Sequence, residues 1–168
     1  MKADILQNEL GSLLGDRFSI AESTRSNYAR GEDVFDPVLS QGIAFPNNNE
    51  EVSKIVIFCN KHSIPIVPFG TGTSLEGHVL GNKTGITISL ENMNKILSVN
   101  AEDFDCRVQA FVTRKQLNEE LKNIGLFFPI DPGADASIGG MAATSASGTM
   151  AVRYGTMRSV VSLSLIHI

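Results

Sequence analysis

Pro68-Phe69-Gly70-Thr71-Gly72-Thr73-Ser74 is a short stretch rich in glycine and hydroxyl side chains. It begins within the apolar segment 64–69, which we predict to be a buried β-strand. A glycine-rich turn after a strand can direct its backbone N–H groups into a concave anion site. The stretch therefore predicts a binding site for the phosphate of a nucleotide.

A second run of small residues extends from Asp131 to Gly148. Of the 17 residues from Gly133 to Thr149, 14 are Gly, Ala, Ser or Thr. Small residues allow the backbone to approach a flat or charged ligand closely. Two such runs in one chain indicate a large nucleotide cofactor rather than a lone phosphate, and we expect both runs to border one crevice.

The composition indicates an ordinary soluble globular domain, because 42% of the 168 residues are hydrophobic and 19% are charged. The formal net charge is −4 and the lysines and arginines are scattered singly, which argues against nucleic acid as a partner. No apolar run approaches the length of a membrane span, and the start lacks the apolar core of a secretion signal. Cys59 and Cys106 lie far apart, so we expect free thiols in a cytoplasmic protein and no metal site.

The hydrophobic pattern predicts both helices and strands. Apolar residues over 5–14 recur at helical spacing and Gly15 ends that helix, whereas the polar segment 22–36 is expected to be a surface loop. A second helix is expected with Asn49 as its N-cap and an apolar face of Val52, Ile55, Val56 and Cys59. Besides the strand over 64–69, we expect an alternating strand over 86–90 and strands over 96–99 and 107–112. A third helix is expected to begin with a capping box of Thr113 and Gln116, to turn Leu117, Leu121 and Ile124 inward, and to end at Gly125.

Two common nucleotide motifs do not fit the first glycine stretch. Gly70 and Gly72 begin the dinucleotide-binding pattern, but Leu75 replaces its third glycine. Gly72 to Gly77 has the spacing of an ATPase phosphate loop, but His78-Val79 replaces the lysine and hydroxyl residue that such a loop requires. Backbone N–H groups and hydroxyls remain as donors, which suits a cofactor that is held rather than a triphosphate that is cleaved. The alternative is a tight turn whose glycines serve only steric needs.

Four motifs in order resemble a known family. They are residues 68–78, Phe128-Pro129-Ile130-Asp131-Pro132-Gly133-Ala134, residues 137–143, and Arg153-Tyr154-Gly155-Thr156-Met157. Together they look like the flavin-binding half of FAD-linked 2-hydroxy-acid oxidoreductases, the D-lactate dehydrogenase (cytochrome) and glycolate oxidase subunit group of the vanillyl-alcohol oxidase and p-cresol methylhydroxylase fold family. The likeness runs from Tyr28 to Arg158, and Gly31 departs from it, since relatives tend to carry an acidic residue there.

The resemblance implies an α+β, two-subdomain FAD-binding fold of the p-cresol methylhydroxylase (PCMH) type that is incomplete at its C-terminus. We expect an N-terminal helix and surface loop over 1–36, the truncated FAD-binding domain over 37–162, and a non-native tail over 163–168. The tail matches the translation of a transposon end used in preparing sequencing libraries. In the family, the substrate carboxylate and any catalytic metal are bound by the part that would then be missing.

The resemblance also implies which residues bind FAD. The pyrophosphate would lie on the first stretch, the flavin and ribityl chain along the second run, and three residues would approach from the far wall. The residues for the pyrophosphate are Pro68, Gly70, Thr71, Gly72, Thr73 and Ser74. Those for the flavin and ribityl chain are Asp131, Pro132, Ser137, Gly139, Gly140, Met141 and Ala143. Those of the far wall are Ser147, Gly148 and Arg153. His78 is expected to be structural, and the catalytic residues are unknown.

The implied activity is the oxidation of a D-2-hydroxy acid of the D-lactate or glycolate class by hydride transfer to the flavin, with an electron acceptor that is unknown. We expect the segment alone to be inactive and to retain FAD weakly or not at all. Alternatives are another oxidoreductase of the same fold, such as a sugar-lactone oxidase or an NADPH-dependent reductase of cell-wall precursor synthesis, or a nucleotide-binding fragment without catalysis.

Overall fold

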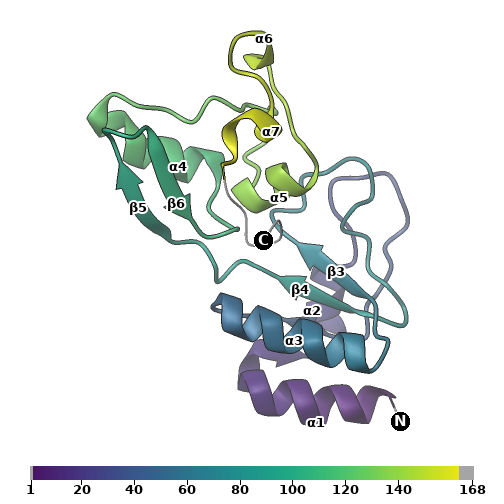
Figure 1. The fold of residues 1–168 in the computed structure, drawn as a ribbon. Helices are drawn as coiled ribbons and strands as arrows, with labels where there is room; N and C mark the ends of the chain where they lie inside the picture. The colour runs from purple at the N-terminus through teal and green to yellow at the C-terminus, as the bar shows by residue number, and fades with distance from the viewer. Residues whose placement is uncertain (1, 163–168) are drawn as a thin grey trace. The chain divides into compact units, whose positions relative to one another are not determined.

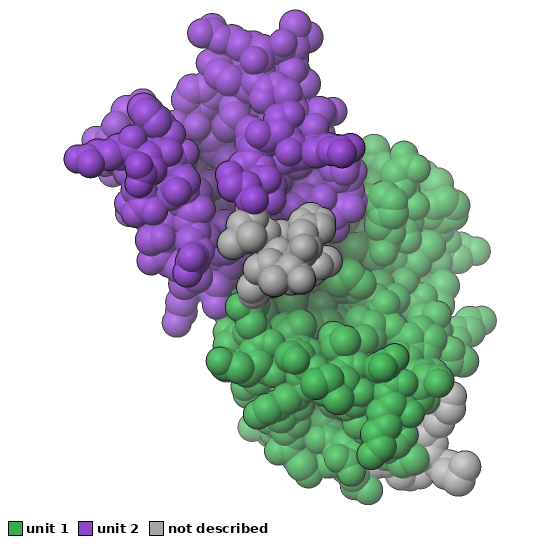
Figure 2. Space-filling model, viewed as in Figure 1, with its two compact units in different colours: residues 1–93 green, residues 94–168 purple. Residues whose placement is uncertain are grey.

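The structure is a computed structural model that describes the backbone of residues 2–162 and the side chains of residues 5–162. The expected tail over 163–168 lies outside the described residues. The chain forms two compact units, residues 1–93 and residues 94–168 (Figure 2). Each unit is described by itself below, with the element labels of Figure 1.

Unit 1 is built on a four-stranded sheet in the order β1-β2-β4-β3, of which β3 and β4 are labelled in Figure 1. β1 is antiparallel to β2, and the other neighbours are parallel. The strands are β1 (Phe18–Ser19), β2 (Ile43–Ala44), β3 (Ile66–Phe69) and β4 (Ile86–Ser89), and the helices are α1 (Lys2–Leu14), the short 3-10 helix η1 (Gly15–Arg17), α2 (Glu22–Asn27) and α3 (Asn49–Lys61). The core joins Leu6, Leu10 and Leu14 of α1, Ile55 and Cys59 of α3, and Ile86 and Ile88 of β4.

Helices α1 and α3 of unit 1 begin and end close to where the sequence predicts. α1 ends before Gly15, which has a φ of +59° and so takes a conformation that glycine adopts readily. α3 is capped by Asn48, whose side chain accepts a hydrogen bond of 2.9 Å from the amide of Glu51, so the prediction of Asn49 as N-cap is wrong by one residue. The prediction of a loop over 22–36 is wrong for its first part, which forms α2.

The order of the strands in the sheet explains why the burial predicted for β3 and β4 is wrong. β3 is an edge strand in which Phe69 is buried and Pro68 is exposed, so it is not the buried strand that its apolar sequence indicates. An edge position suits Pro68, because proline has no N–H for a second neighbour. β4 lies between two parallel neighbours and all four of its residues are buried, although its sequence alternates. The buried hydroxyl of Thr87 lies 2.8 Å from that of Ser40.

Tyr28 follows α2 and packs edge-on against the rings of Phe45 and Phe69, at centroid distances of 5.5 and 5.1 Å. Its hydroxyl donates a hydrogen bond of 2.6 Å to Glu91. Burial, together with the Glu91 carboxylate, raises the pKa of Tyr28 to about 12. The neutral phenol is therefore favoured in the folded protein.

We expect the stabilisation from Tyr28 to fade at alkaline pH. It is complete below the ordinary tyrosine pKa of about 10, and it falls as the pH rises toward the folded-state value because only the unfolded chain then ionises. Urea unfolding should show a larger loss of stability for Tyr28→Phe at about pH 8 than at about pH 11. An equal loss at both pH values would contradict this.

Unit 2 contains the two-stranded antiparallel sheet of β5 and β6 and several short helices. Its elements are β5 (Ile96–Asn100), β6 (Asp105–Val108), α4 (Arg114–Leu121), η2 (Lys122–Ile124), α5 (Ile138–Ala143), α6 (Ala151–Tyr154) and α7 (Met157–Val160) (Figure 1). One apolar cluster contains Val112, Leu117 and Leu121, and another contains Ile130, Met141 and Met157.

The predicted capping box of α4 is half formed. The Thr113 hydroxyl accepts from the amide of Gln116 at 3.2 Å, but the Gln116 side chain donates to the carbonyl of Asn94 instead of returning to Thr113. Leu117 and Leu121 are buried as predicted, whereas Ile124 is exposed, and Gly125 ends the η2 turn with a φ of +74°. The strand predicted over 107–112 is shorter and begins earlier, at Asp105. Within the described residues, no helix is long and apolar enough to cross a membrane.

Candidate functional site

The first glycine stretch forms a half-buried loop directly after β3 in unit 1. Gly72 is buried and has a φ of +72°. A Cβ atom at this position would lie 2.9 Å from the Phe69 ring. Position 72 therefore requires glycine for both its conformation and its space.

The loop presents amide groups without protein acceptors. Within the part of the chain that the structure describes, no acceptor takes the amide N–H of Gly70, Gly72, Thr73 or Ser74. Leaving such donors without water or a ligand costs free energy, so a cluster of them on a half-buried loop suits an anionic oxygen group.

Hydroxyl groups lie beside these amides. The hydroxyls of Thr71 and Thr73 are 3.4 Å apart, and the Ser74 hydroxyl is 2.8 Å from Nδ1 of His78. His78 is exposed, and its ring meets the loop at this Ser74 hydroxyl. The loop can therefore offer several neutral donors to a pyrophosphate group.

The second run is not one continuous loop, because it contains α5. The Ser137 hydroxyl caps α5 by accepting from the Gly140 amide at 3.3 Å. The amides of Ile138 and Gly139 donate to the carbonyls of Val112 and Ala110, both at 2.8 Å. The first amides of this helix are thus used within unit 2 rather than directed to a ligand.

Two glycines of the second run are required by packing. A Cβ on Gly139 would lie 2.8 Å from Ala110, and one on Gly148 would lie 1.9 Å from the carbonyl oxygen of Asp131. The two ends of the run are therefore in direct backbone contact. For these two positions, close packing explains the glycine without a ligand.

Other predicted residues differ in their surroundings. The Asp131 carboxylate accepts from the Gly133 amide at 3.2 Å and lies 3.5 Å from the Arg114 guanidinium. Arg153 is exposed on α6, with its guanidinium carbon 5.2 Å from the centroid of the Tyr154 ring. Met141 is buried in the apolar cluster of unit 2, whereas Pro132, Ala143 and Ser147 are exposed.

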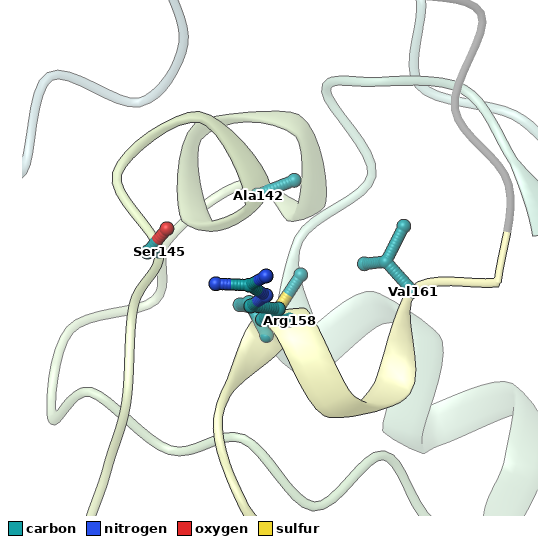
Figure 3. Close-up of a pocket in the computed structure, with 5 residues that line it drawn as sticks. Ala142, Ser145, Arg158 and Val161 are labelled. Atoms are coloured by element: carbon teal, nitrogen blue, oxygen red, sulfur yellow. The ribbon is translucent and has the colours of Figure 1, made fainter. Parts of the chain in front are cut away.

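A pocket of about 450 Å³ lies within unit 2. It is lined by Ala142, Ser145, Met157, Arg158 and Val161 (Figure 3). Ala142 lies within the run 137–143 that was predicted to line the flavin, whereas no binding role was predicted for Met157, Arg158 or Val161. The lining residues come from α5, from α7 and from the residues that follow each helix, so no single stretch of sequence marks the pocket.

The structure groups the predicted site residues by unit. Pro68 and the residues of the first loop lie in unit 1, whereas the residues from Asp131 to Arg153 lie in unit 2. That both groups border one crevice stays a prediction.

The FAD binding domain family model matches residues 40–165. The chain belongs to the FAD binding domain family. The fold class and the cofactor predicted from the sequence are thereby confirmed. The amides of Gly70, Gly72, Thr73 and Ser74, which have no acceptor among the described residues, suit the anionic part of this cofactor.

Curated relatives carry the names of the expected group. The chain is 49% identical to the "Probable D-lactate dehydrogenase, mitochondrial" of Danio rerio, covering 88% of this chain and 30% of the relative. It is 42% identical to the mitochondrial D-lactate dehydrogenase (cytochrome) of Arabidopsis thaliana, covering 96% of this chain and 29% of the relative. The glycolate oxidase subunit GlcD of Bacillus subtilis is 31% identical over 73% of this chain and 27% of its own length. The chain therefore spans about 30% of the length of such relatives.

Solved structures share the fold. An alkyldihydroxyacetonephosphate synthase superposes with a TM-score of 0.84 at 22% identity, covering 94% of this chain and 32% of its own. A p-cresol methylhydroxylase superposes with a TM-score of 0.64 at 21% identity, covering 76% and 25%. At this identity the likeness supports the PCMH-type fold alone.

Proposed function

We propose that this chain is the FAD-binding portion of an oxidoreductase that oxidises a D-2-hydroxy acid of the D-lactate or glycolate class. The observation that carries the proposal is the loop after β3, where neighbouring amides have no protein acceptor among the described residues. The names of the relatives support the substrate class, since they include D-lactate dehydrogenases and a glycolate oxidase subunit.

In this proposal the first loop holds the FAD pyrophosphate. The amides of Gly70, Gly72, Thr73 and Ser74 donate to phosphate oxygens, and the hydroxyls of Thr71 and Thr73 add further donors. Pro68 fixes the direction of the chain as it enters the loop, because its ring restricts φ. No lysine is present from Gly70 to Asn82, so binding relies on oriented neutral dipoles.

The residues of unit 2 have a different part in the proposal. Their small side chains let backbone and cofactor approach one another along the flavin and ribityl chain, and the exposed Arg153 offsets phosphate charge. The proposed residues are Asp131, Pro132, Ser137, Gly139, Gly140, Met141, Ala143, Ser147, Gly148 and Arg153. Packing sets the positions of Gly139 and Gly148, so their contribution is to shape the surface rather than to donate hydrogen bonds.

FAD, when bound, supplies the hydride acceptor for the oxidation. The chain's residues position the cofactor and donate hydrogen bonds to its pyrophosphate. We assign no general base and no metal ligand to this chain.

A chimera tests the proposal. Residues of this chain would replace the matching segment of the Arabidopsis thaliana relative, with which it shares 42% identity over 164 residues. We expect the chimera to purify with bound FAD whose visible absorbance is bleached, without oxygen, by D-lactate or glycolate but not by L-lactate. The parent protein is the control.

Two results would separate the parts of the proposal. A chimera that folds but retains no FAD, while its parent retains it, would contradict cofactor binding by these residues. A chimera that retains FAD but is not bleached by any 2-hydroxy acid that bleaches its parent would contradict the assigned substrate class alone.

A further inference from the structure

A segment before the family match lies along the phosphate-binding loop within unit 1. It runs from Tyr28 to Phe35, whereas the FAD binding domain match begins at residue 40. The ring of Tyr28 packs against Phe69, which immediately precedes the loop. The amide of Glu32 donates to the carbonyl of Gly72 at 2.9 Å. This segment, residues 28–35, is called the strap below.

The strap also contacts the residues that follow the phosphate-binding loop in the chain. The amide of Gly81 donates to the carbonyl of Ala29 at 3.3 Å. The ring of Phe35 covers Gly77 so closely that a Cβ on Gly77 would lie 2.9 Å from it. The strap therefore contacts the residue before the loop, the loop itself and the residues after it.

Gly31 is the closest point between the strap and the loop. A Cβ atom on Gly31 would lie 2.4 Å from the carbonyl oxygen of Gly72 and 2.8 Å from Cγ2 of Val79. The φ angle of Gly31 is not positive, so the requirement is one of space and not of backbone conformation. Because the nearest atom belongs to the backbone, any larger residue must move the strap or the loop.

Asp33 holds the strap in this shape. Its side chain is buried, with 7% of the residue exposed. Its two carboxylate oxygens accept from the amides of Gly31 and Phe35, both at 3.1 Å. These bonds fix the turn that brings Gly31 against Gly72, since each amide is tied to the same buried carboxylate.

We propose that the strap is a positioning element that fixes the conformation of the phosphate-binding loop, and that Gly31 is its decisive residue. The inference rests on the proposed function for its consequence, which is that the strap sets the affinity for FAD. The absence of a side chain at position 31 lets the Gly72 carbonyl reach the Glu32 amide. The amide N–H of Thr73 is thereby oriented, because it shares a planar peptide bond with the Gly72 carbonyl.

The test compares Gly31→Ala with Gly85→Ala in the full chain. Gly85 is a matched control, because a Cβ there would also lie 2.4 Å from a backbone oxygen, that of Pro65. Gly85 precedes β4, at the opposite end of the parallel β3–β4 pair from the loop. Both variants should lose stability, but only one of them disturbs the strap.

The first readout needs no ligand. We expect Gly31→Ala to shift the NMR signals of the Gly70, Gly72, Thr73 and Ser74 amides and to speed hydrogen exchange at Glu32 by about tenfold or more. Gly85→Ala should leave both unchanged. Asp33→Ala serves as a second strap variant if Gly31→Ala does not fold, with the same expected changes.

The second readout is a titration with FAD and, separately, with ADP, which shares its pyrophosphate. Gly31→Ala should weaken both by about tenfold or more relative to Gly85→Ala. Loop signals that stay in place in the strap variants, or FAD affinities that are equal in the two glycine variants, would overturn the inference. If the loop signals move, the unsubstituted chain binds neither ligand and the chimera described above also retains no FAD, then the positioning role stands and the proposed function fails.

Discussion

Gly72→Ala should weaken FAD binding by about tenfold or more, and it should lower the free energy of unfolding by less than the loss in binding free energy. Gly72 has a φ of +72°, which costs a residue with a Cβ about 1–2 kcal/mol. The added Cβ would also lie 2.9 Å from the Phe69 ring. Since a factor of ten in affinity corresponds to about 1.4 kcal/mol, relaxation of the loop out of its binding conformation is enough to produce the loss. Flavin fluorescence during a titration of the chain into FAD measures it.

Gly15→Ala is the matched control for this substitution. Gly15 has a φ of +59°, but no atom lies within 4 Å of an added Cβ. It carries the same kind of backbone cost at the end of α1, remote in the sequence from the loop. We expect it to lower stability by about 1–2 kcal/mol and to leave FAD binding unchanged. Equal FAD affinities for the two variants would contradict the role of the loop.

Gly148→Ala should destabilise unit 2 by about 3 kcal/mol or more. An added Cβ would lie 1.9 Å from the carbonyl oxygen and 2.7 Å from the amide nitrogen of Asp131. Both atoms belong to the backbone, so no side-chain rotation can relieve the overlap, and the two ends of the second run must separate. Chemical unfolding followed by circular dichroism would show the loss.

Gly133→Ala provides the comparison within the same run. Gly133 has a φ of +91°, and no atom lies within 4 Å of an added Cβ, so the cost is conformational only, about 1–2 kcal/mol. If both variants unfold at the same denaturant concentration, then Gly148 and Asp131 are not in the contact that the structure describes.

Local signals in the sequence predicted α1, α3 and α4, but not the short helices α2, α5, α6 and α7. Leucines at intervals of four residues and a following glycine define α1, and Thr113 marks the start of α4, because caps and helical faces depend on nearby residues. Strand burial was predicted less well. The position of β3 at the sheet edge and of β4 inside it depends on β2, which is distant in the sequence. The six-residue α2 lies in a polar segment whose composition is typical of a loop.

In the candidate site, too, the features that depend on neighbouring residues were predicted, and those that depend on distant residues were not. Glycines and hydroxyls in one stretch predicted the loop after β3, because such a loop depends on neighbouring residues. That this loop binds phosphate stays a prediction. The packing of Gly139 on Ala110 and of Gly148 on Asp131 could not be predicted, since each contact joins residues far apart in the chain. Gly31 gave a sequence signal, as a departure from relatives, but its contact with Gly72 appears only in the folded unit.

The central claim is that neutral backbone donors of the loop after β3 bind the FAD pyrophosphate. Titrating the isotope-labelled chain with FAD while recording its amide NMR signals tests this most directly, and it also detects weak binding. We predict progressive shifts at Gly70, Gly72, Thr73 and Ser74, reproduced by ADP and lost in Gly72→Ala. Shifts confined to other amides, or none up to the solubility limit of FAD, would contradict the claim.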